Sequence, residues 1–290
     1  MASKPPTNAR LYHAEISGEA ALPQDRDVLL ALRRISLHAA VPGAENRSFM
    51  MRAVAWLARA GIGQFLDIGA GLPAWGNVHE IASRFRSDVT VAYVDHDPEV
   101  VEGWRARSLD RSRIIAVQAD VRRPREILDH EQVRSLIDFS RPVGLLLGAV
   151  MHLVADRDEP VEIVRTLVDA LAPGSFLVLS QVTEEAQPPE TVAEVCRILS
   201  RVGIEVTPRS REQVGRFFTG LDLVEPGVVP VTEWRPARTD PRPGTGWYVG
   251  GVGCKPEVAP DGSALAGYAA DEPDGVGILE GDAGLRPPRG

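Results

Sequence analysis

The sequence predicts an α/β fold with a doubly wound parallel sheet and a helical cap at its N-terminus. Five short apolar runs alternate with stretches of helical periodicity, and they occupy residues 64–68, 89–95, 113–118, 143–150 and 175–181. Each run consists almost entirely of apolar residues, as strands do when helices cover both faces of a parallel sheet. These observations indicate an open sheet of five parallel strands.

Helical patterns precede, connect and follow these strands. Apolar residues recur at helical spacing before the first strand, and Gly61 is a stop signal just ahead of it. The expected helices are residues 25–40, 47–62, 79–85, 97–109, 159–174 and 188–206, with a short one from residue 210. The apolar, glycine-rich segment 246–256 is expected to add a closing strand.

The chain divides into three parts on these patterns. Residues 1–60 are expected to form an N-terminal helical cap or lid, and residues 61–255 the main α/β domain. Residues 256–290 are rich in glycine, proline and acids and contain few large apolar side chains. Because such a composition buries too little apolar surface to offset the entropy of ordering, we expect a flexible tail.

The composition excludes several classes of partner. The formal charge is -8, with 40 acidic against 32 basic residues, so nucleic acid is not expected to bind. No run of about 18 apolar residues occurs, and the N-terminus has no apolar core of signal-peptide length. Cys196 and Cys254 lie far apart and lack C-x-x-C spacing, which favours free thiols. We therefore expect a cytoplasmic protein without a membrane partner.

The first strand runs into a glycine turn, D-I-G-A-G. In an open α/β sheet, ligands bind beyond the carboxyl ends of the strands, and the turn after the first strand comes closest to them. Gly69 and Gly71 allow a positive φ and a close approach of the backbone to a ligand. A dinucleotide-binding turn has a third glycine, but this sequence has Ala74 there, beside Pro73. Asp67 favours a cationic ligand instead, and S-adenosylmethionine carries an ammonium and a sulfonium group.

Further acids follow the second and third strands. Asp95 lies 24 residues beyond Gly71, where a carboxylate can accept hydrogen bonds from the ribose hydroxyls of an adenosine. Asp120 is in reach of an adenine amino group, and Val121 can pack on the ring. His96 and Gly148, also at strand ends, complete this part of the predicted cofactor site. The alternatives are local: a helix N-cap neighbour for Asp67, a strand-end turn residue for Asp95 and an Asx-turn former for Asp120.

The motifs of the chain resemble those of a known family over roughly residues 8–255. They are Asn46-Arg47, the segment 64–69, Gly71-Leu72-Pro73, Asn77, His79-Glu80, Tyr93-Val94-Asp95, Asp97-Pro98, the segments 119–122 and 147–156, Pro173-Gly174-Ser175 and the glycine-rich segment 250–253. The resemblance is to the actinobacterial S-adenosyl methyltransferases, formerly known only as a domain of unknown function. It implies a Rossmann-like class I methyltransferase sheet and S-adenosylmethionine as the methyl donor.

The N-terminal segment departs from this family. Members usually carry an Arg-x-Tyr-Asp-Tyr segment and a following Gly-Gly-Lys-Asp-Asn segment that close over the methyl donor. The chain keeps Arg10 and Tyr12, which the resemblance makes lid residues, but has His13 and Ala14 where the family has Asp-Tyr. It also has Glu-Ala-Ala at residues 19–21. A different substrate or weaker lid contacts would follow from these changes.

Two histidines are candidates for roles near the reacting groups. His152 lies at the carboxyl end of the fourth strand, and as a hypothesis it is the general base, because imidazole titrates near neutral pH. The alternative is that it packs or forms a hydrogen bond beside the adenosine. His79, together with Asn77, is expected near the methionine end of the cofactor, unless Asn77 only caps the following helix. Trp75 either stacks on a substrate or covers the turn.

The predicted function is in-line methyl transfer from S-adenosylmethionine to a small-molecule acceptor of secondary metabolism. No D/N-P-P-Y segment follows the fourth strand, which argues against the amide or exocyclic nitrogens that this motif handles. No cluster of His, Asp or Glu has the spacing of metal ligands, so no metal is expected. Two alternatives stay open: a dinucleotide-dependent oxidoreductase, and a catalytically silent protein that binds S-adenosylmethionine as a regulator or partner subunit.

Overall fold

A mixed β-sheet forms the centre of the computed structural model, which describes residues 4–18, 22–35, 42–107, 109–236 and 244–257. The strand order is β3-β2-β1-β4-β5-β8-β6, and β7 pairs with β8. The strands are β1 (Gln64–Ile68), β2 (Thr90–Asp95), β3 (Ile114–Gln118), β4 (Gly144–Gly148), β5 (Phe176–Val182), β6 (Asp222–Leu223), β7 (Val229–Pro230) and β8 (Tyr248–Cys254). Strands β1 to β5 are parallel, whereas β8 is antiparallel to β5. This order confirms the predicted doubly wound class I methyltransferase sheet.

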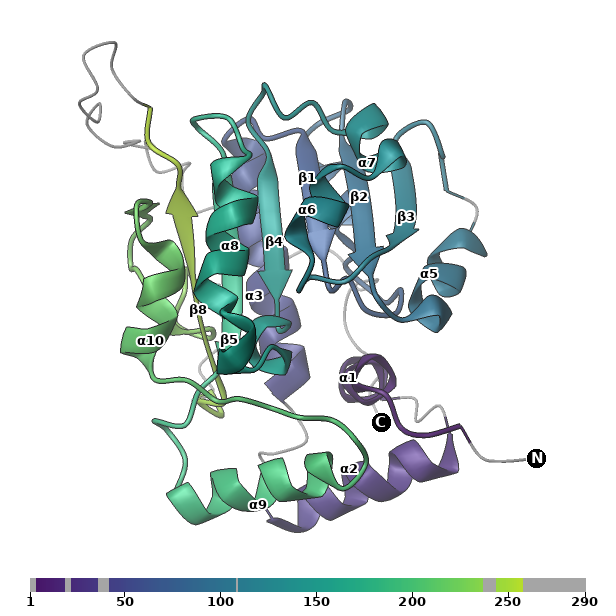
Figure 1. Cartoon of the computed structure of the whole chain (residues 1–290), viewed down its shortest axis with the longest axis vertical. Helices are drawn as coiled ribbons and strands as arrows, with labels where there is room; N and C mark the ends of the chain where they lie inside the picture. Colours follow the sequence, from purple (N-terminus) through teal and green to yellow (C-terminus); the bar gives the residue numbers. More distant parts are fainter. Residues whose placement is uncertain (1–3, 19–21, 36–41, 108, 237–243, 258–290) are drawn as a thin grey trace.

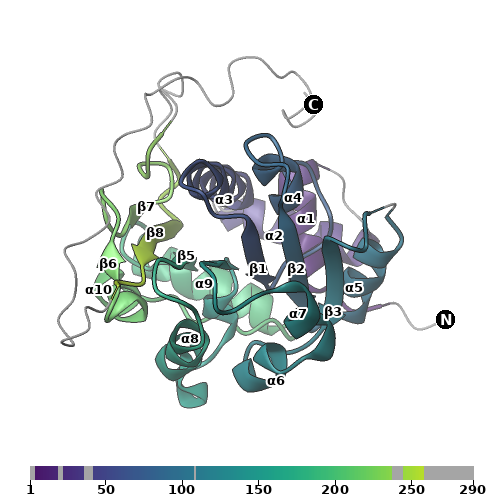
Figure 2. The ribbon, with the colours of Figure 1, turned by 90° about the horizontal axis from the view of Figure 1, so that it is seen from above.

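Helices cover both faces of the sheet (Figures 1 and 2). One apolar core lies under α3 (Pro42–Arg59), α4 (Val78–Ala82) and α5 (Pro98–Arg105). The other lies under α6 (Pro124–Leu128), α7 (Glu131–Leu136), α8 (Pro160–Asp169) and α10 (Arg211–Gly215). Alternate residues of each strand enter the two cores: Phe65 faces the first and Leu66 the second, both fully buried. The apolar runs in the sequence therefore reflect burial on both faces.

Three helices lie near the carboxyl ends of the parallel strands, below the arrowheads in Figure 1. They are α1 (Asn8–Ser17), α2 (Pro23–Ile35) and α9 (Pro189–Ser200), and α9 packs against α2. The N-terminal helices are thus joined by a helix from a distant part of the sequence. By contrast, α3 packs on the face of the sheet, against β4, β5 and β8. The boundaries proposed for the cap and the main domain remain predictions.

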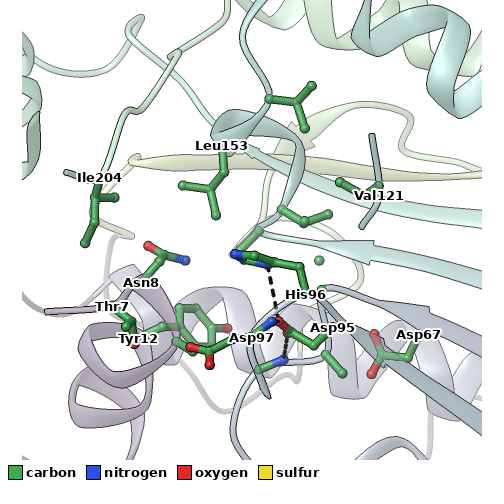
Figure 3. Close-up of a pocket in the computed structure, with 18 of the residues that line it drawn as sticks. Thr7, Asn8, Tyr12, Asp67, Asp95, His96, Asp97, Val121, Leu153 and Ile204 are labelled. Carbon is green, nitrogen blue, oxygen red and sulfur yellow. Dashed lines mark hydrogen bonds and ion pairs between the residues drawn. The ribbon is translucent and has the colours of Figure 1, made fainter. Parts of the chain in front are cut away.

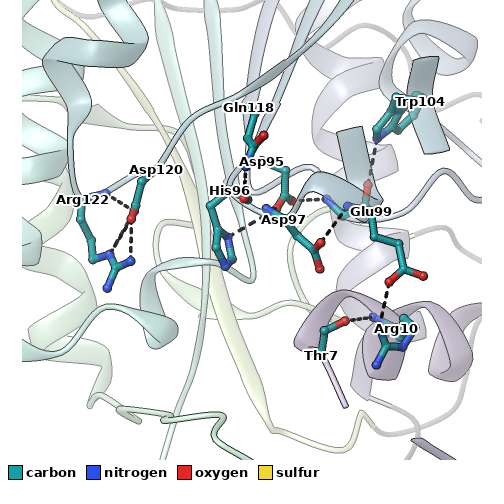
Figure 4. Close-up of polar contacts among 11 residues, drawn as sticks. Thr7, Arg10, Asp95, His96, Asp97, Glu99, Trp104, Gln118, Asp120 and Arg122 are labelled. Atoms are coloured by element: carbon teal, nitrogen blue, oxygen red, sulfur yellow. Dashed lines mark hydrogen bonds and ion pairs between the residues drawn. The ribbon is translucent and has the colours of Figure 1, made fainter. Parts of the chain in front are cut away.

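Helix α1 occupies a segment in which the sequence analysis expected no helix. Thr7 caps its start, with its Oγ1 accepting a hydrogen bond from the Arg10 N–H at 3.3 Å. Gly18 ends it in the left-handed conformation, at φ 73°. The buried Arg10 guanidinium attaches α1 to its neighbours: it lies 2.8 Å from Asp25 in α2. It also lies 2.9 Å from Glu99 in α5 (Figure 4). Leu11, Ala14 and Ile16 are also buried, so the helix is held by apolar packing as well as by these ion pairs.

Other differences between prediction and structure are small. Helices α6 and α7 fill the connection between β3 and β4, where no helix was expected, and α3 begins at Pro42 instead of Arg47. Helix α2 ends at Ile35, and the rest of the predicted helix, residues 36–40, lies outside the described residues. So do residues 19–21 and nearly all of the predicted tail, residues 258–290. Within the described segments, no helix is both long and apolar enough to span a bilayer.

Candidate functional site

A cavity of about 480 Å³ opens at the carboxyl ends of β1 to β4 (Figure 3). We call it the strand-end cavity. Its walls come from α1, α3, the turns after these strands, the 3₁₀ helices η2 (Met151–Leu153) and η3 (Asp156–Asp158), and residues 203–207. The predicted site residues that line it are Tyr12, Asp67, Gly69, Gly71, Asp95, His96, Asp120, Val121 and Gly148. The predicted residues Arg10, Trp75, Asn77, His79 and His152 are not among its lining residues.

The glycine turn brings the backbone close to the cavity. Gly69 has φ +73°, and a Cβ at this position would lie 2.6 Å from Cγ2 of Val150. Gly71 has φ +65°, and a Cβ there would meet no atom within 4 Å. The N–H groups of Gly69 and Ala70 donate to the carbonyl of Val94 in β2, at 2.8 and 3.1 Å. Only glycine satisfies both the conformation and the close approach at position 69.

Asp95 is buried and joins this turn to the end of β2. Its Oδ2 accepts a hydrogen bond from the N–H of Gly71 at 3.0 Å, and its Oδ1 accepts one from the N–H of Asp97 at 3.0 Å. The exposed His96 ring lies 3.5 Å from Oδ1, and this contact raises the pKa of His96 (Figure 4). The carboxylate is therefore held in a fixed orientation at the edge of the cavity.

Asp67, at the end of β1, is a buried carboxylate, with 8% of its surface exposed. Burial raises its pKa to about 7, although the nearby Arg47 guanidinium opposes the rise, while Asp95 adds to it. Among the described residues, no hydrogen-bond donor reaches its side chain. A cationic ligand would supply the charge complement that this carboxylate lacks.

Asp120 has a partner within its own turn. Its Oδ1 accepts from the Arg122 N–H at 2.9 Å, and both carboxylate oxygens lie 3.0 Å from Arg122 Nε (Figure 4). Burial raises the pKa of Asp120, but these bonds from Arg122 outweigh it and the net shift is downward. The Asx turn that the sequence left open is thus present, and Asp120 and Val121 still line the cavity.

His152 occupies η2 and is buried, with 3% of its surface exposed. Its ring packs edge-on against Tyr248, with the centroids 5.9 Å apart. Burial, together with the charge of Arg209, lowers the pKa of His152 to about 3. A buried imidazole outside the cavity lining fits the packing alternative, and the general-base role of His152 stays a prediction.

The remaining predicted residues support the walls of the cavity. Asn77 is the N-cap of α4, and its Oδ1 accepts from the Ala74 N–H at 3.2 Å. His79 Nδ1 lies 2.7 Å from the hydroxyl of Tyr93. Trp75 donates its indole N–H to the Ile16 carbonyl of α1 at 2.9 Å, so it joins the turn to the lid helix. Tyr12 lines the cavity itself, and burial raises its pKa to about 12.

Several lining residues were not predicted as site residues. Thr7, the N-cap of α1, and Asn8, its first residue, line the cavity together with Asn46 and Arg47 of α3. Glu205 and Thr207 come from the segment after α9. Of these six residues, only Asn46 and Arg47 belong to a motif of the family resemblance. The others come from segments that tertiary packing places beside the strand ends, with no motif in the sequence. In the described part of the chain, no three His, Cys, Asp or Glu side chains are grouped to hold a metal ion.

Comparisons with known proteins agree with this geometry. A family model described as S-adenosyl methyltransferase matches residues 1–256. A DUF574 family protein from Streptomyces avermitilis is 38% identical, with a TM-score of 0.81 over 87% of this chain and 98% of its own. A putative methyltransferase from Thermobifida fusca is 36% identical, with a TM-score of 0.80 over 87% of this chain and 95% of its own.

A possible exported protein from Bordetella parapertussis shares the fold at 17% identity, with a TM-score of 0.53 over 87% of this chain and 80% of its own. Among curated proteins the chain has no match. The family model and the two structures above 30% identity each extend over most of the chain. The chain therefore belongs to the S-adenosyl methyltransferase family, whose cofactor is S-adenosylmethionine.

Proposed function

We propose that the chain transfers the methyl group of S-adenosylmethionine to a small-molecule acceptor bound in the strand-end cavity. The observation that carries this proposal is the meeting of two buried carboxylates, Asp67 and Asp95, with the glycine turn in one cavity. Its volume, about 480 Å³, falls within the range of roughly 300–1,000 Å³ that is usual for small-molecule sites. The acids complement a ligand that carries two positive charges and a ribose.

The residues fit this cofactor from one end to the other. Val121 offers an apolar surface to an adenine ring beyond β3, and the fixed Asp95 carboxylate can accept hydrogen bonds from ribose hydroxyls. Asp67 gives an ammonium group a carboxylate partner, and Gly71, where a Cβ would meet no atom within 4 Å, leaves open space beside the backbone. When bound, S-adenosylmethionine supplies an electrophilic methyl group on a sulfonium sulfur. The chain then has to orient an acceptor in line with it.

The acceptor is expected between α1, η2 and residues 203–207. Thr7 and Asn8 supply polar groups there, while Leu153 and Ile204 supply apolar surface (Figure 3). This mixed wall supports a small organic acceptor with an apolar body. A role in secondary metabolism is supported by the resemblance to actinobacterial proteins, and the free thiols of Cys196 and Cys254 support a cytoplasmic location.

Calorimetric titration with S-adenosylmethionine and S-adenosylhomocysteine tests the proposal, with NAD as the comparison ligand. Micromolar binding of both adenosyl ligands, and at least about tenfold weaker binding by Asp95→Asn, is expected. Asp88→Asn is the matched control, since Asp88 is an exposed acid paired with Arg86. No binding by the wild type would overturn the proposal. Binding without turnover on any acceptor would favour the silent regulator instead.

A further inference from the structure

One positively charged side chain, Arg47, lines the strand-end cavity and is not part of the pattern of acids at the strand ends. Arg47, on α3, lines the cavity and is half-buried. Its Nε donates to the carbonyl of Trp75 at 3.1 Å, and its Nη2 donates to Oδ1 of Asn77 at 3.1 Å. Both acceptors lie in the loop that follows the glycine turn. These bonds fix the plane of the guanidinium, while no described residue accepts a hydrogen bond from its Nη1.

Arg47 lies near Asp67 without forming an ion pair with it. Both side chains line the cavity, and no described ion pair joins them within 4.0 Å. The guanidinium is nevertheless close enough for its charge to oppose the rise in the pKa of Asp67. The cavity is therefore lined by a positive and a negative group that are close enough to interact. A ligand with one anionic and one cationic group would satisfy both.

Asn46, the neighbour of Arg47, adds an acceptor. It is 1% exposed, lines the cavity, and donates its Nδ2–H to the hydroxyl of Tyr12 at 2.9 Å. Its Oδ1 is buried and has no hydrogen-bond partner among the described residues. Since a buried oxygen without a donor is costly, a ligand N–H at this position would stabilise the site.

We infer that Arg47 binds the carboxylate of the methionine end of S-adenosylmethionine, and that Asp67 and Asn46 Oδ1 bind its ammonium group. The inference deepens the proposed function and rests on it. An α-amino acid carries both charges on one carbon, so its recognition requires a cation and acceptors placed next to each other. A guanidinium suits a carboxylate because it presents parallel N–H donors.

The other cavity-lining arginines of the described chain are placed differently. Arg122 is bound to Asp120, at the end of β3 where the adenine is expected. Arg157 is exposed in η3. Arg122 therefore serves as a matched control, because it is also a cavity arginine but lies at the opposite end of the proposed cofactor position.

Decarboxylated S-adenosylmethionine tests this assignment, because it keeps the sulfonium and ammonium groups and lacks only the carboxylate. The wild type is expected to bind S-adenosylmethionine about tenfold to a hundredfold more tightly than the decarboxylated analogue in calorimetric titrations. Arg47→Gln should bring this ratio close to one, mainly by weakening the binding of S-adenosylmethionine. Arg47→Lys should give an intermediate ratio, and Arg122→Gln should keep the ratio of the wild type.

The outcomes separate the two proposals. A wild type that binds both ligands equally would overturn the role of Arg47, and this measurement needs no variant to fold. Equal weakening of both ligands in Arg47→Gln would also overturn it, since Arg47 would then only hold the loop at residues 75–77. Failure of the wild type to bind either adenosyl ligand would overturn the proposed function itself. Circular dichroism of each variant shows whether it is folded.

Discussion

The N–H of Gly71 donates a hydrogen bond of 3.0 Å to Oδ2 of Asp95, so the glycine turn after β1 and the acid after β2 form one structural unit. The second carboxylate oxygen accepts the N–H of Asp97, which begins the next helix. One side chain thus organises two turns at the mouth of the cavity. A residue at such a position contributes to stability as well as to ligand binding.

Asp95→Ala is therefore expected to lower both the stability of the protein and its affinity for the ligand. Removal of the carboxylate leaves the N–H groups of Gly71 and Asp97 without their acceptor, which should lower the free energy of unfolding by about 1–3 kcal/mol. Denaturant unfolding measures this change. Asp88→Ala, which removes an exposed acid paired with Arg86, should change it by less than about 1 kcal/mol. Equal effects of the two substitutions would contradict the structural role of Asp95.

The sequence predicted the sheet and the acids well for a physical reason. Parallel strands bury both faces and so produce continuous apolar runs, and the carboxyl ends of such strands meet at one edge. Asp67, Asp95 and Asp120 could therefore be placed together from their positions after three strands. His152 also follows β4, but its side chain packs beside Tyr248 and does not line the cavity, so its role as a general base stays a prediction.

The features that the sequence did not predict, helix α1 and the position of Arg47, depend on contacts between segments that are far apart along the chain. The buried Arg10 of helix α1 forms ion pairs with Asp25 and Glu99, which come from other helices. Arg47 precedes the first strand, yet the packing of α3 along the sheet carries it to the cavity. Local patterns in a sequence do not encode such placements, because the partners are far apart along the chain.

Because the pKa of Asp67 is raised, Asp67→Asn is expected to increase the stability of the protein while it weakens the binding of S-adenosylmethionine. The folded-state pKa of about 7 lies above the ordinary value of 3.8, so the folded protein favours the protonated form. The resulting stabilisation is present below pH 4 and is lost as the pH rises through 7. Asp67→Asn should thus raise the free energy of unfolding at pH 8 by about 1 kcal/mol or more relative to wild type. At pH 4.5 the difference should be much smaller.

Unfolding of both proteins in denaturant at pH 4.5, 6, 7 and 8 measures this effect. The same Asp67→Asn protein should bind S-adenosylmethionine more weakly, since the amide cannot balance the charge of the ammonium group. A difference in stability that does not change with pH would show that Asp67 titrates at its ordinary value.

His152→Leu is expected to remove part of the acid sensitivity of the protein. The folded-state pKa of His152, about 3, lies below the ordinary value of 6.5, so the folded protein excludes the proton. The stabilisation from the neutral ring is present above pH 6.5 and is lost as the pH falls toward 3. Between pH 7.5 and pH 5 the wild type should lose about 2 kcal/mol more stability than the variant. Equal losses would mean that the ring is protonated in the folded state at pH 5, as a solvent-accessible base would be.

Gly69→Ala tests the close approach of the glycine turn to the loop after β4. Alanine at φ +73° carries a backbone strain of about 1–2 kcal/mol, and its Cβ would lie 2.6 Å from Cγ2 of Val150. Gly71→Ala has a similar φ, +65°, but its Cβ would meet no atom within 4 Å. Denaturant unfolding should therefore give a larger loss of stability for Gly69→Ala than for Gly71→Ala.

A double variant tests whether contact with Val150 causes this difference. If it does, Val150→Ala should relieve the contact, and Gly69→Ala/Val150→Ala is expected to be less destabilised than the sum of its two single variants. Strict additivity would mean that the loop moves away from residue 69 at little cost and that backbone conformation alone requires the glycine.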